Sequence, residues 1–258
     1  MMSNNDIGQG DAIPFEQVLS ELADGEKPLL NANLAYLSDL SQQQINLLED
    51  VWTGIELKRK RQIMQRLFEL AEGDVSLDFD SIFKRRLHDE DAEIRRAAIE
   101  GLWENEEISL IEPLTGLMQN DASADVQAAA ALALGRFAML AEHCKLDSGY
   151  RQSLSHSLLS VFANGSKEIE VRRRALEAAS PISLQKVRQA ITDAYRSNNA
   201  SLKASAIYSM GRNCDPYWLP VLTAELNSRN AELRYEAAVA CGELGEEDAV
   251  PALSLIHI

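Results

Sequence analysis

The sequence has few residues that interrupt regular structure, with 13 glycines and 7 prolines among its 258 residues. Glycine and proline punctuate turns, whereas Leu, Ala, Glu and Arg favour helix. Aromatic residues make up only 6% of the chain, while 46% of the residues are hydrophobic and 25% are charged. This balance is that of an ordinary soluble globular protein. The composition therefore predicts a mainly helical protein of one or two domains with a sizeable core.

Cysteine is scarce as well, and Cys144, Cys214 and Cys241 are widely spaced without a CxxC pair. The pattern excludes a disulfide framework and a zinc site, and it predicts buried small hydrophobic residues in a reducing compartment. The first residues lack the basic and apolar regions of a signal peptide. No apolar run approaches the length of a membrane span. We therefore expect a cytoplasmic protein without a membrane partner.

Positive charge is in deficit, since the formal net charge is −15 and the pI is near 4.7. A surface this acidic repels phosphate backbones, so we expect no nucleic-acid partner. The charge itself has two interpretations, which are simple solubility and attraction of a basic partner. A short KRKR run at residues 58–61 is surrounded by acids and is interpreted as a solvated helix face.

Motifs of catalysis are missing too. The sequence contains neither GxSxG, a Walker A loop nor a GxGxxG fingerprint. A nucleophilic site needs a base held beside a Ser, Cys or Thr, but His88, His143 and His156 fall in or next to expected turns and an insertion. We therefore predict no catalytic residue, no cofactor and no metal, and we expect that the protein is not an enzyme.

One stretch nevertheless has the composition of an active site. Residues 88–102 read HDEDAEIRRAAIEGL and place His88 and three acids close to Arg95 and Arg96. The alternative is a turn that ends one helix and starts the next. A feature that recurs along the chain favours the second interpretation, because a catalytic site has no reason to repeat.

The chain does repeat itself beyond residue 77. Five segments align: DAEIRRAAIEGL (91–102), SADVQAAAALAL (123–134), EIEVRRRALEAA (168–179), NASLKASAIYSM (199–210) and NAELRYEAAVAC (230–241). The fourth residue of each is an apolar anchor: Ile94, Val126, Val171, Leu202 and Leu233. Successive anchors are 32, 45, 31 and 31 residues apart, so the period is near 31 with an insertion of about 14 residues close to 142–155.

The columns of this alignment predict a helix that packs at close range. Four residues after each anchor stands an alanine, on the same helix face: Ala98, Ala130, Ala175, Ala206 and Ala237. Small side chains there let neighbouring helices approach closely. Three residues before each anchor stand Asp91, Ser123, Glu168, Asn199 and Asn230, which we interpret as turn or helix-capping residues.

A second apolar-periodic stretch precedes each turn, so the unit is helix, turn, helix. Such a hairpin cannot bury its own apolar faces, and the units must stack. The predicted fold is all-α, a right-handed α-α superhelix of helical hairpins. We expect a disordered stretch at residues 1–13, a helical cap at 14–77, and a solenoid at 78–258 with five repeats and a truncated sixth. Because the last residues, PALSLIHI, begin a hairpin and stop, we expect that the natural chain continues.

The signature D-x-D-x-x-(I/V/L)-(R/K)-x-x-A, clearest in DEDAEIRRAA (89–98), resembles HEAT repeats, and more narrowly the short HEAT-like type of phycobilisome lyase subunits. Residues 1–77 look like the leader of bacterial HEAT-repeat proteins of unassigned role. The resemblance implies a hydrogen-bonded ladder between repeats, made by Asp89 and Asp121 with the arginines that follow the anchors, Arg95, Arg172 and Arg234. Gln127 and Lys203 depart from this pattern, so we expect an incomplete ladder.

The resemblance also implies where a partner binds, because the second helices of HEAT hairpins line the concave side. The candidate residues are Arg96, Trp103, Leu132, Arg136, Tyr208, Arg212 and Tyr235. An aromatic row flanked by charge is typical of a recognition groove, but the same side chains can instead pack on neighbouring helices. We expect a non-catalytic scaffold or adaptor that binds a protein or peptide, which is possibly basic.

The alternative function is a bilin lyase-like enzyme or a tetrapyrrole chaperone subunit, which rests on fold analogy alone. Two enzymatic HEAT families fit less well. Deoxyhypusine hydroxylases carry His-Glu pairs for two irons, and no His-Glu dipeptide occurs in this sequence. DNA glycosylases of this type use a basic face, which the charge of −15 opposes.

Overall fold

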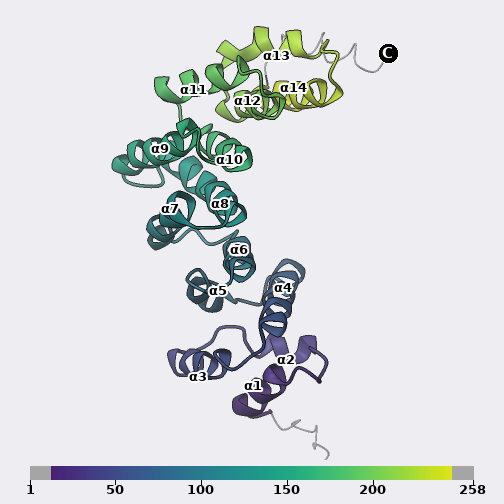
Figure 1. The fold of residues 1–258 in the computed structure, drawn as a ribbon. Helices are drawn as coiled ribbons and strands as arrows, with labels where there is room; N and C mark the ends of the chain where they lie inside the picture. Colours follow the sequence, from purple (N-terminus) through teal and green to yellow (C-terminus); the bar gives the residue numbers. More distant parts are fainter. Residues whose placement is uncertain (1–12, 246–258) are drawn as a thin grey trace, which may run out of the picture. The chain divides into compact units, whose positions relative to one another are not determined.

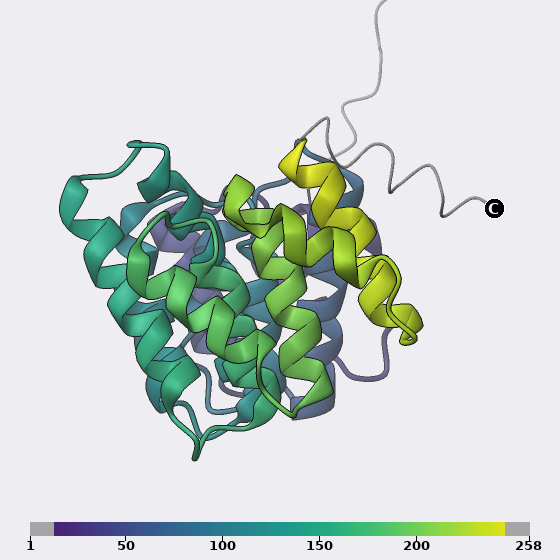
Figure 2. The same ribbon diagram turned by 90° about the horizontal axis from the view of Figure 1, so that it is seen from above.

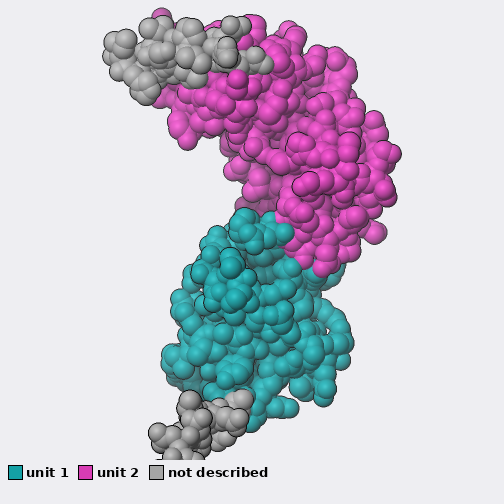
Figure 3. Space-filling view, turned by 180° about the vertical axis from the view of Figure 1, so that it is seen from behind, with its two compact units in different colours: residues 1–104 teal, residues 105–258 magenta. Residues whose placement is uncertain are grey.

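The computed structural model describes residues 13–245, and its regular structure there consists of α-helices and short 3₁₀-helices (Figure 1). The predicted all-α fold is confirmed. By their internal contacts, the residues divide into two compact units, 1–104 and 105–258 (Figure 3). The predictions for the first residues and for the sixth hairpin fall outside the described residues, apart from Ile13.

Unit 1 consists of three helical hairpins in chain order. Its helices are α1 (Phe15–Ala23), α2 (Asn31–Ala35), α3 (Gln42–Trp52), α4 (Leu57–Gly73), α5 (Asp80–Arg86) and α6 (Ala92–Gly101). First helices pack on first helices, as α1 does on α3, and second helices on second helices, as α2 does on α4 and α4 on α6. A capping box between Ser41 and Gln44 starts α3, since each side chain binds the backbone of the other.

The predicted cap therefore stacks in the same way as the repeats. Ile63 on α4 stands 31 residues before the anchor Ile94 on α6, which is one period, and both side chains are buried. Sequence comparison of the repeats misses α4 because Leu67 stands where the other second helices have alanine. The contacts also group α5 and α6 with the cap, whereas the predicted boundary at residue 77 separates them.

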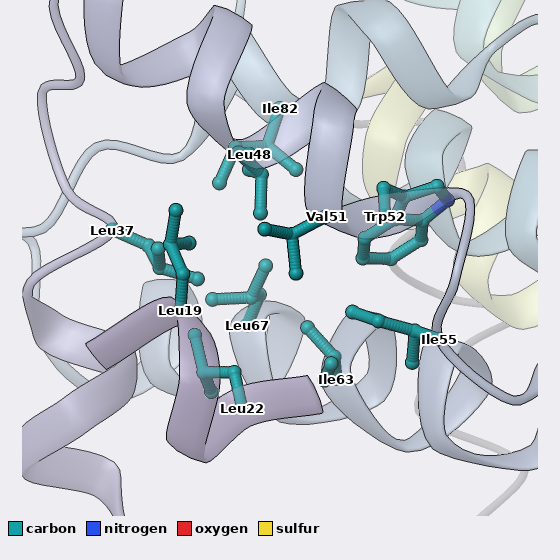
Figure 4. A pocket seen from close by; sticks show the side chains of 10 residues that line it. All are labelled: Leu19, Leu22, Leu37, Leu48, Val51, Trp52, Ile55, Ile63, Leu67 and Ile82. Atoms are coloured by element: carbon teal, nitrogen blue, oxygen red, sulfur yellow. The ribbon is translucent and has the colours of Figure 1, made fainter. Parts of the chain in front are cut away.

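The core of unit 1 is formed by aliphatic side chains and Trp52. Figure 4 shows ten of them converging from four helices and the turns beside them, with Leu19 and Leu22 of α1 facing Leu67 of α4. Burial of this apolar surface is the main stabilising contribution to such a unit. Because these residues pack against one another, the apolar cluster in Figure 4 is a core rather than a ligand site.

Unit 2 contains four hairpins. Its elements are η1 (Ile108–Leu110), α7 (Ile111–Asn120), α8 (Ala124–Glu142), α9 (Ser148–Ala163), α10 (Ile169–Ala179), α11 (Gln185–Tyr195), α12 (Ala200–Asn213), η2 (Pro216–Trp218), α13 (Leu219–Glu225) and α14 (Ala231–Leu244). The second helices pack in order, α8 on α10, α10 on α12 and α12 on α14. Figure 2 shows α12 (green) and α14 (yellow) side by side.

The predicted packing face is confirmed, since all five column alanines are completely buried. Two glycines sharpen the close approach. A Cβ on Gly135 of α8 would lie 3.2 Å from Ala178 Cα of α10, and one on Gly211 of α12 would lie 2.7 Å from Ala240 Cα of α14. Glycine is thus required where consecutive second helices come closest.

The turn residues behave as predicted at three of the five positions. Asp91, Asn199 and Asn230 accept hydrogen bonds from backbone N–H groups of the first helical turn, as N-caps do. Ser123 and Glu168 occupy the same position without a capping side-chain bond. Their helices begin without that contribution.

The side chains after the anchors act mainly within their own turn. Arg95 Nη1 donates to the carbonyl oxygens of Asp89 and Glu90 at 2.8 and 2.9 Å, and Arg234 Nη1 does the same to those of Ser228 and Arg229. These bonds join residues of one hairpin, whereas the predicted ladder joins successive hairpins. A link between hairpins does occur at Lys203, whose Nζ lies 2.7 Å from a carboxylate oxygen of Glu225.

The predicted insertion appears as extra length on α8 and α9. α8 has 19 residues and a mean hydropathy of 1.3, so by length and composition alone it qualifies as a membrane span. The prediction that no apolar run approaches that length was therefore wrong. Half of this segment is buried inside the protein, and α8 packs on α7, α9 and α10. That burial accounts for its apolar character.

The cysteine prediction was correct only for Cys241. That side chain is buried, and burial raises the pKa of its thiol. Cys144 and Cys214 are exposed and have φ values of 57° and 51° at turns that follow α8 and α12. Turn geometry places them, and turns lie at the surface.

Candidate interaction surfaces

The stretch HDEDAEIRRAAIEGL holds structure together. Asp91 caps α6 and also accepts two hydrogen bonds from Arg61 of α4, from Nε at 3.0 Å and Nη2 at 2.6 Å. The bonded Arg61 guanidinium holds the pKa of the Asp91 carboxyl below its usual value. Asp89 accepts a bond from Trp52 Nε1 of α3 at 3.1 Å. The acids of this turn thus bind both helices of the preceding hairpin.

A buried arginine completes this junction. Arg86 at the end of α5 is only 5% exposed, and its guanidinium lies 4.6 Å from the centre of the Trp52 ring. It pairs with Glu49 of α3 and lies 3.5 Å from Asp89. The cluster of Glu49, Trp52, Arg86 and Asp89 joins α3 to the α5–α6 turn.

The KRKR run is not a uniformly solvated face. Arg59 is buried, and its Nε donates to the Leu22 carbonyl at the end of α1 at 2.9 Å. Lys60 Nζ lies 5.9 Å from the Trp52 ring centre, and Arg61 binds Asp91. Three of the four cations therefore hold unit 1 together, which corrects the interpretation from sequence.

Two of the seven candidate binding residues lie in unit 1. Arg96 pairs with Glu100 one turn further along α6, with 2.6 Å between Nη1 and Oε1. Trp103 follows the end of α6 and is 53% exposed. Exposed tryptophan is common in binding hot spots, so Trp103 is available for contact.

The other five residues lie in unit 2. On α8, Leu132 is 55% exposed, and the guanidinium of Arg136 lies 5.2 Å from the Phe137 ring centre. Tyr208 and Arg212 stand on α12 and Tyr235 on α14, with exposures of 36% for Tyr208 and 66% for Tyr235.

The seven residues thus belong to two units, and their assignment to a single concave face stays a prediction. Within unit 2, α12 and α14 pack directly on each other and bring Tyr208, Arg212 and Tyr235 onto neighbouring helices. Arg212 Nη1 lies 3.5 Å from a carboxylate oxygen of Glu243 on α14.

Sequence reasoning missed a polar network that crosses from α10 to α12. Ser205 Oγ donates to Glu177 Oε1 at 2.6 Å, and Arg173 Nε donates to Ser205 Oγ at 2.9 Å. Arg174 Nη1 also lies 2.8 Å from Glu177 Oε2, so the buried Glu177 carboxylate is satisfied on both oxygens. Ser205 stands three residues after its anchor, a column that was not compared among the repeats.

Among residues 13–245, no group of three or more metal-binding side chains comes together. The strongest perturbation of an ionisable group lies instead at Tyr195. Burial and the hydrogen bond from its hydroxyl to Glu225, at 2.6 Å, together with the charge of that carboxylate, raise its pKa to about 12. Lys203 Nζ lies 4.8 Å from the same ring centre. These three residues connect α11, α12 and α13.

This triad predicts a loss of stability in strongly basic solution. Because the pKa of Tyr195 in the folded protein lies above its ordinary value of 10, the neutral phenol stabilises the fold below pH 10, and this contribution disappears between pH 10 and about 12. In urea unfolding across this range, wild type should lose stability more steeply than Tyr195→Phe. Tyr217→Phe, which alters an exposed ring of unit 2, is the control. Equal slopes for wild type and Tyr195→Phe would contradict the assignment.

Comparison with known proteins places this architecture. A search of curated proteins found no match. Among solved structures, a designed armadillo repeat protein is 19% identical over 90% of this chain and 100% of its own, with a TM-score of 0.44. Another, in complex with the peptide (KR)4, is 16% identical over 89% of this chain and 99% of its own, with a TM-score of 0.41. Human deoxyhypusine hydroxylase is 18% identical over 93% of this chain and 88% of its own, with a TM-score of 0.37.

The family comparison is more direct. The family description "HEAT repeats" matches residues 80–148 and 189–256, which together make up more than half of the chain. The first match begins at α5, close to the residue at which the repeats were predicted to start. On this evidence the chain belongs to the family of HEAT-repeat proteins.

Proposed function

We propose that this protein is a non-catalytic scaffold that binds a protein or peptide on the second helices of unit 2, α8, α10, α12 and α14. The observation that carries the proposal is the exposure of Leu132, Tyr208 and Tyr235 on these helices. Tyrosine offers a large contact area and one hydroxyl, which suits it to binding surfaces. Neighbouring acids provide a polar surround, as protein interfaces have.

Rigid packing beneath this surface supports the proposal. The Asn213 amide at the end of α12 donates to the Ser180 carbonyl at 2.8 Å and accepts from Trp218 Nε1 at 3.0 Å. This buried network joins the ends of α10 and α12 to η2. A surface that is already ordered loses less conformational entropy when a partner binds.

We further propose a basic partner in a cytoplasmic setting and a bacterial source, in keeping with the acidic charge and the resemblance to short HEAT-like repeats. The net charge of −15 favours association with cations over nucleic acid. We favour a protein partner over a tetrapyrrole because the apolar cluster of unit 1 is occupied by its own side chains.

The test is affinity capture with cross-linking, comparing wild type with a Tyr208→Ala, Tyr235→Ala double variant. We expect the double variant to lose the partner that wild type captures, because two aromatic contacts are removed without touching the core. Tyr217→Ala is the matched control, since Tyr217 is 59% exposed but belongs to η2 rather than to a second helix. Identical partners for the double variant and wild type would refute the surface.

A further inference from the structure

The surface of α10, α12 and α14 contains more acid than its own cations can neutralise. Arg173 and Arg174 pair with Glu170 and Glu177 on α10, and Arg212 pairs with Glu243 across to α14. Glu236 of α14 is left over. Among the described residues it has no hydrogen bond and no ion pair.

Glu236 is also poorly placed for a free carboxylate. It is half-buried and follows the exposed Tyr235 on α14. Burial raises its pKa, and so do the charges of Glu177, Glu232 and Glu243, against a smaller opposing effect of Arg173. The carboxylate is thus partly desolvated and faces three other acids, so a cation beside it would be favoured.

Tyr208 of α12 lies on the same surface. Burial raises the pKa of its hydroxyl, and the charges of Glu177, Glu243 and Glu236 add to the effect while Arg212 opposes it. The ring therefore stands within electrostatic reach of Glu236. An aromatic ring face attracts a cation, and the attraction grows as water is removed.

Resting on the proposed function, we propose that Glu236, Tyr208 and Tyr235 form the seat for one arginine or lysine side chain of an extended peptide partner. The Glu236 carboxylate would accept the charged N–H groups, and the two tyrosine rings would cover the apolar part and the face of the cation. Arginine fits this combination best, since its planar guanidinium both stacks on rings and binds carboxylates through two N–H groups.

The seat also predicts an opposite effect of one substitution on stability and on binding. Because the folded-state pKa of Glu236 lies above 4.5, its charge opposes folding at neutral pH, and its protonated form is favoured as pH falls. Glu236→Gln should therefore raise the melting temperature while weakening binding. A purely structural glutamate would lower stability when replaced.

The experiment uses the full chain and fluorescence anisotropy with labelled extended peptides that carry arginine at alternate positions. Matched peptides carry citrulline, which is neutral and of the same shape, or glutamate. We expect the arginine peptide to bind wild type, Glu236→Gln to bind it about tenfold more weakly, equivalent to about 1.4 kcal/mol, and Tyr208→Ala to weaken binding as well. The control is Asp193→Asn on α11, which removes the same charge from an exposed side chain.

The outcomes separate this inference from the proposed function. Equal loss in Asp193→Asn and Glu236→Gln would overturn the seat, because only the net charge would matter. Equal binding of the arginine and citrulline peptides, still abolished by Tyr208→Ala, would also overturn the seat while leaving the scaffold surface intact. If none of the peptides binds and affinity capture finds no Tyr208-dependent partner, both proposals fail.

Discussion

Arg86→Ala should destabilise unit 1 by about 3–5 kcal/mol, since removal of one member of a buried ion pair leaves the other charges without compensation. Arg86 is almost fully buried, pairs with Glu49 of α3 and covers the ring of Trp52. Its loss leaves the Glu49 and Asp89 carboxylates together at the junction without their shared cation. We expect the damage to appear first in α3 and α5.

Hydrogen exchange read by mass spectrometry measures this effect helix by helix, which suits a chain whose two units need not unfold together. Arg85→Ala is the matched control, because Arg85 is the neighbouring residue and is exposed. We expect it to change stability by no more than about 0.5 kcal/mol. Similar protection of α3 in Arg86→Ala and in Arg85→Ala would show that the cluster does not hold the hairpins together.

Gly211→Ala should destabilise unit 2 by about 1–3 kcal/mol, the usual range for overpacking a tight contact. The new methyl group would meet the backbone of α14 at Ala240 Cα, 2.7 Å away, as well as the Glu243 carboxylate. A side chain can rotate away, but a backbone atom cannot. The two helices must therefore separate, which disturbs the surface that contains Tyr208 and Tyr235.

The same substitution elsewhere in unit 2 should have the opposite sign. A Cβ on Gly116, in the middle of α7, meets nothing within 4 Å. Gly116→Ala should therefore stabilise by about 0.5–1 kcal/mol through the higher helix propensity of alanine. Urea unfolding of the two variants measures both effects in one unit. Two changes of the same sign would mean that propensity rather than close packing decides at position 211.

The repeated part of this fold could be predicted from the sequence because one physical demand recurs five times. Each second helix must accept a neighbour at close range, so Ala98 and its four equivalents share a column. Asp91 was predicted in the same way as a capping residue. The cap was harder to interpret, because α4 meets α6 through Leu67, where the column alanine is absent.

Single polar residues that act once were not predictable. Arg59, Arg86 and Glu177 are charged and would be expected in water, yet each is buried against partners distant in sequence. Nothing in their neighbourhood signals such a contact, since the partner is supplied by another helix. The candidate binding residues were chosen by helical spacing, which predicts a face but not its ion pairs. Glu236 therefore escaped attention although it stands beside Tyr235.

The bond between Asp91 and Arg61 has a consequence for how the hairpins find their order during folding. Hairpins of such similar shape can dock on the wrong neighbour, a known hazard of repeat arrays. Ser123, Asn199 and Asn230 occupy the position of Asp91 without a charge, so none of them could satisfy Arg61. Trp52 makes the same demand on Asp89. The acids of one turn thus act as a label, by which the α3–α4 hairpin distinguishes its proper successor from three near copies further along the chain.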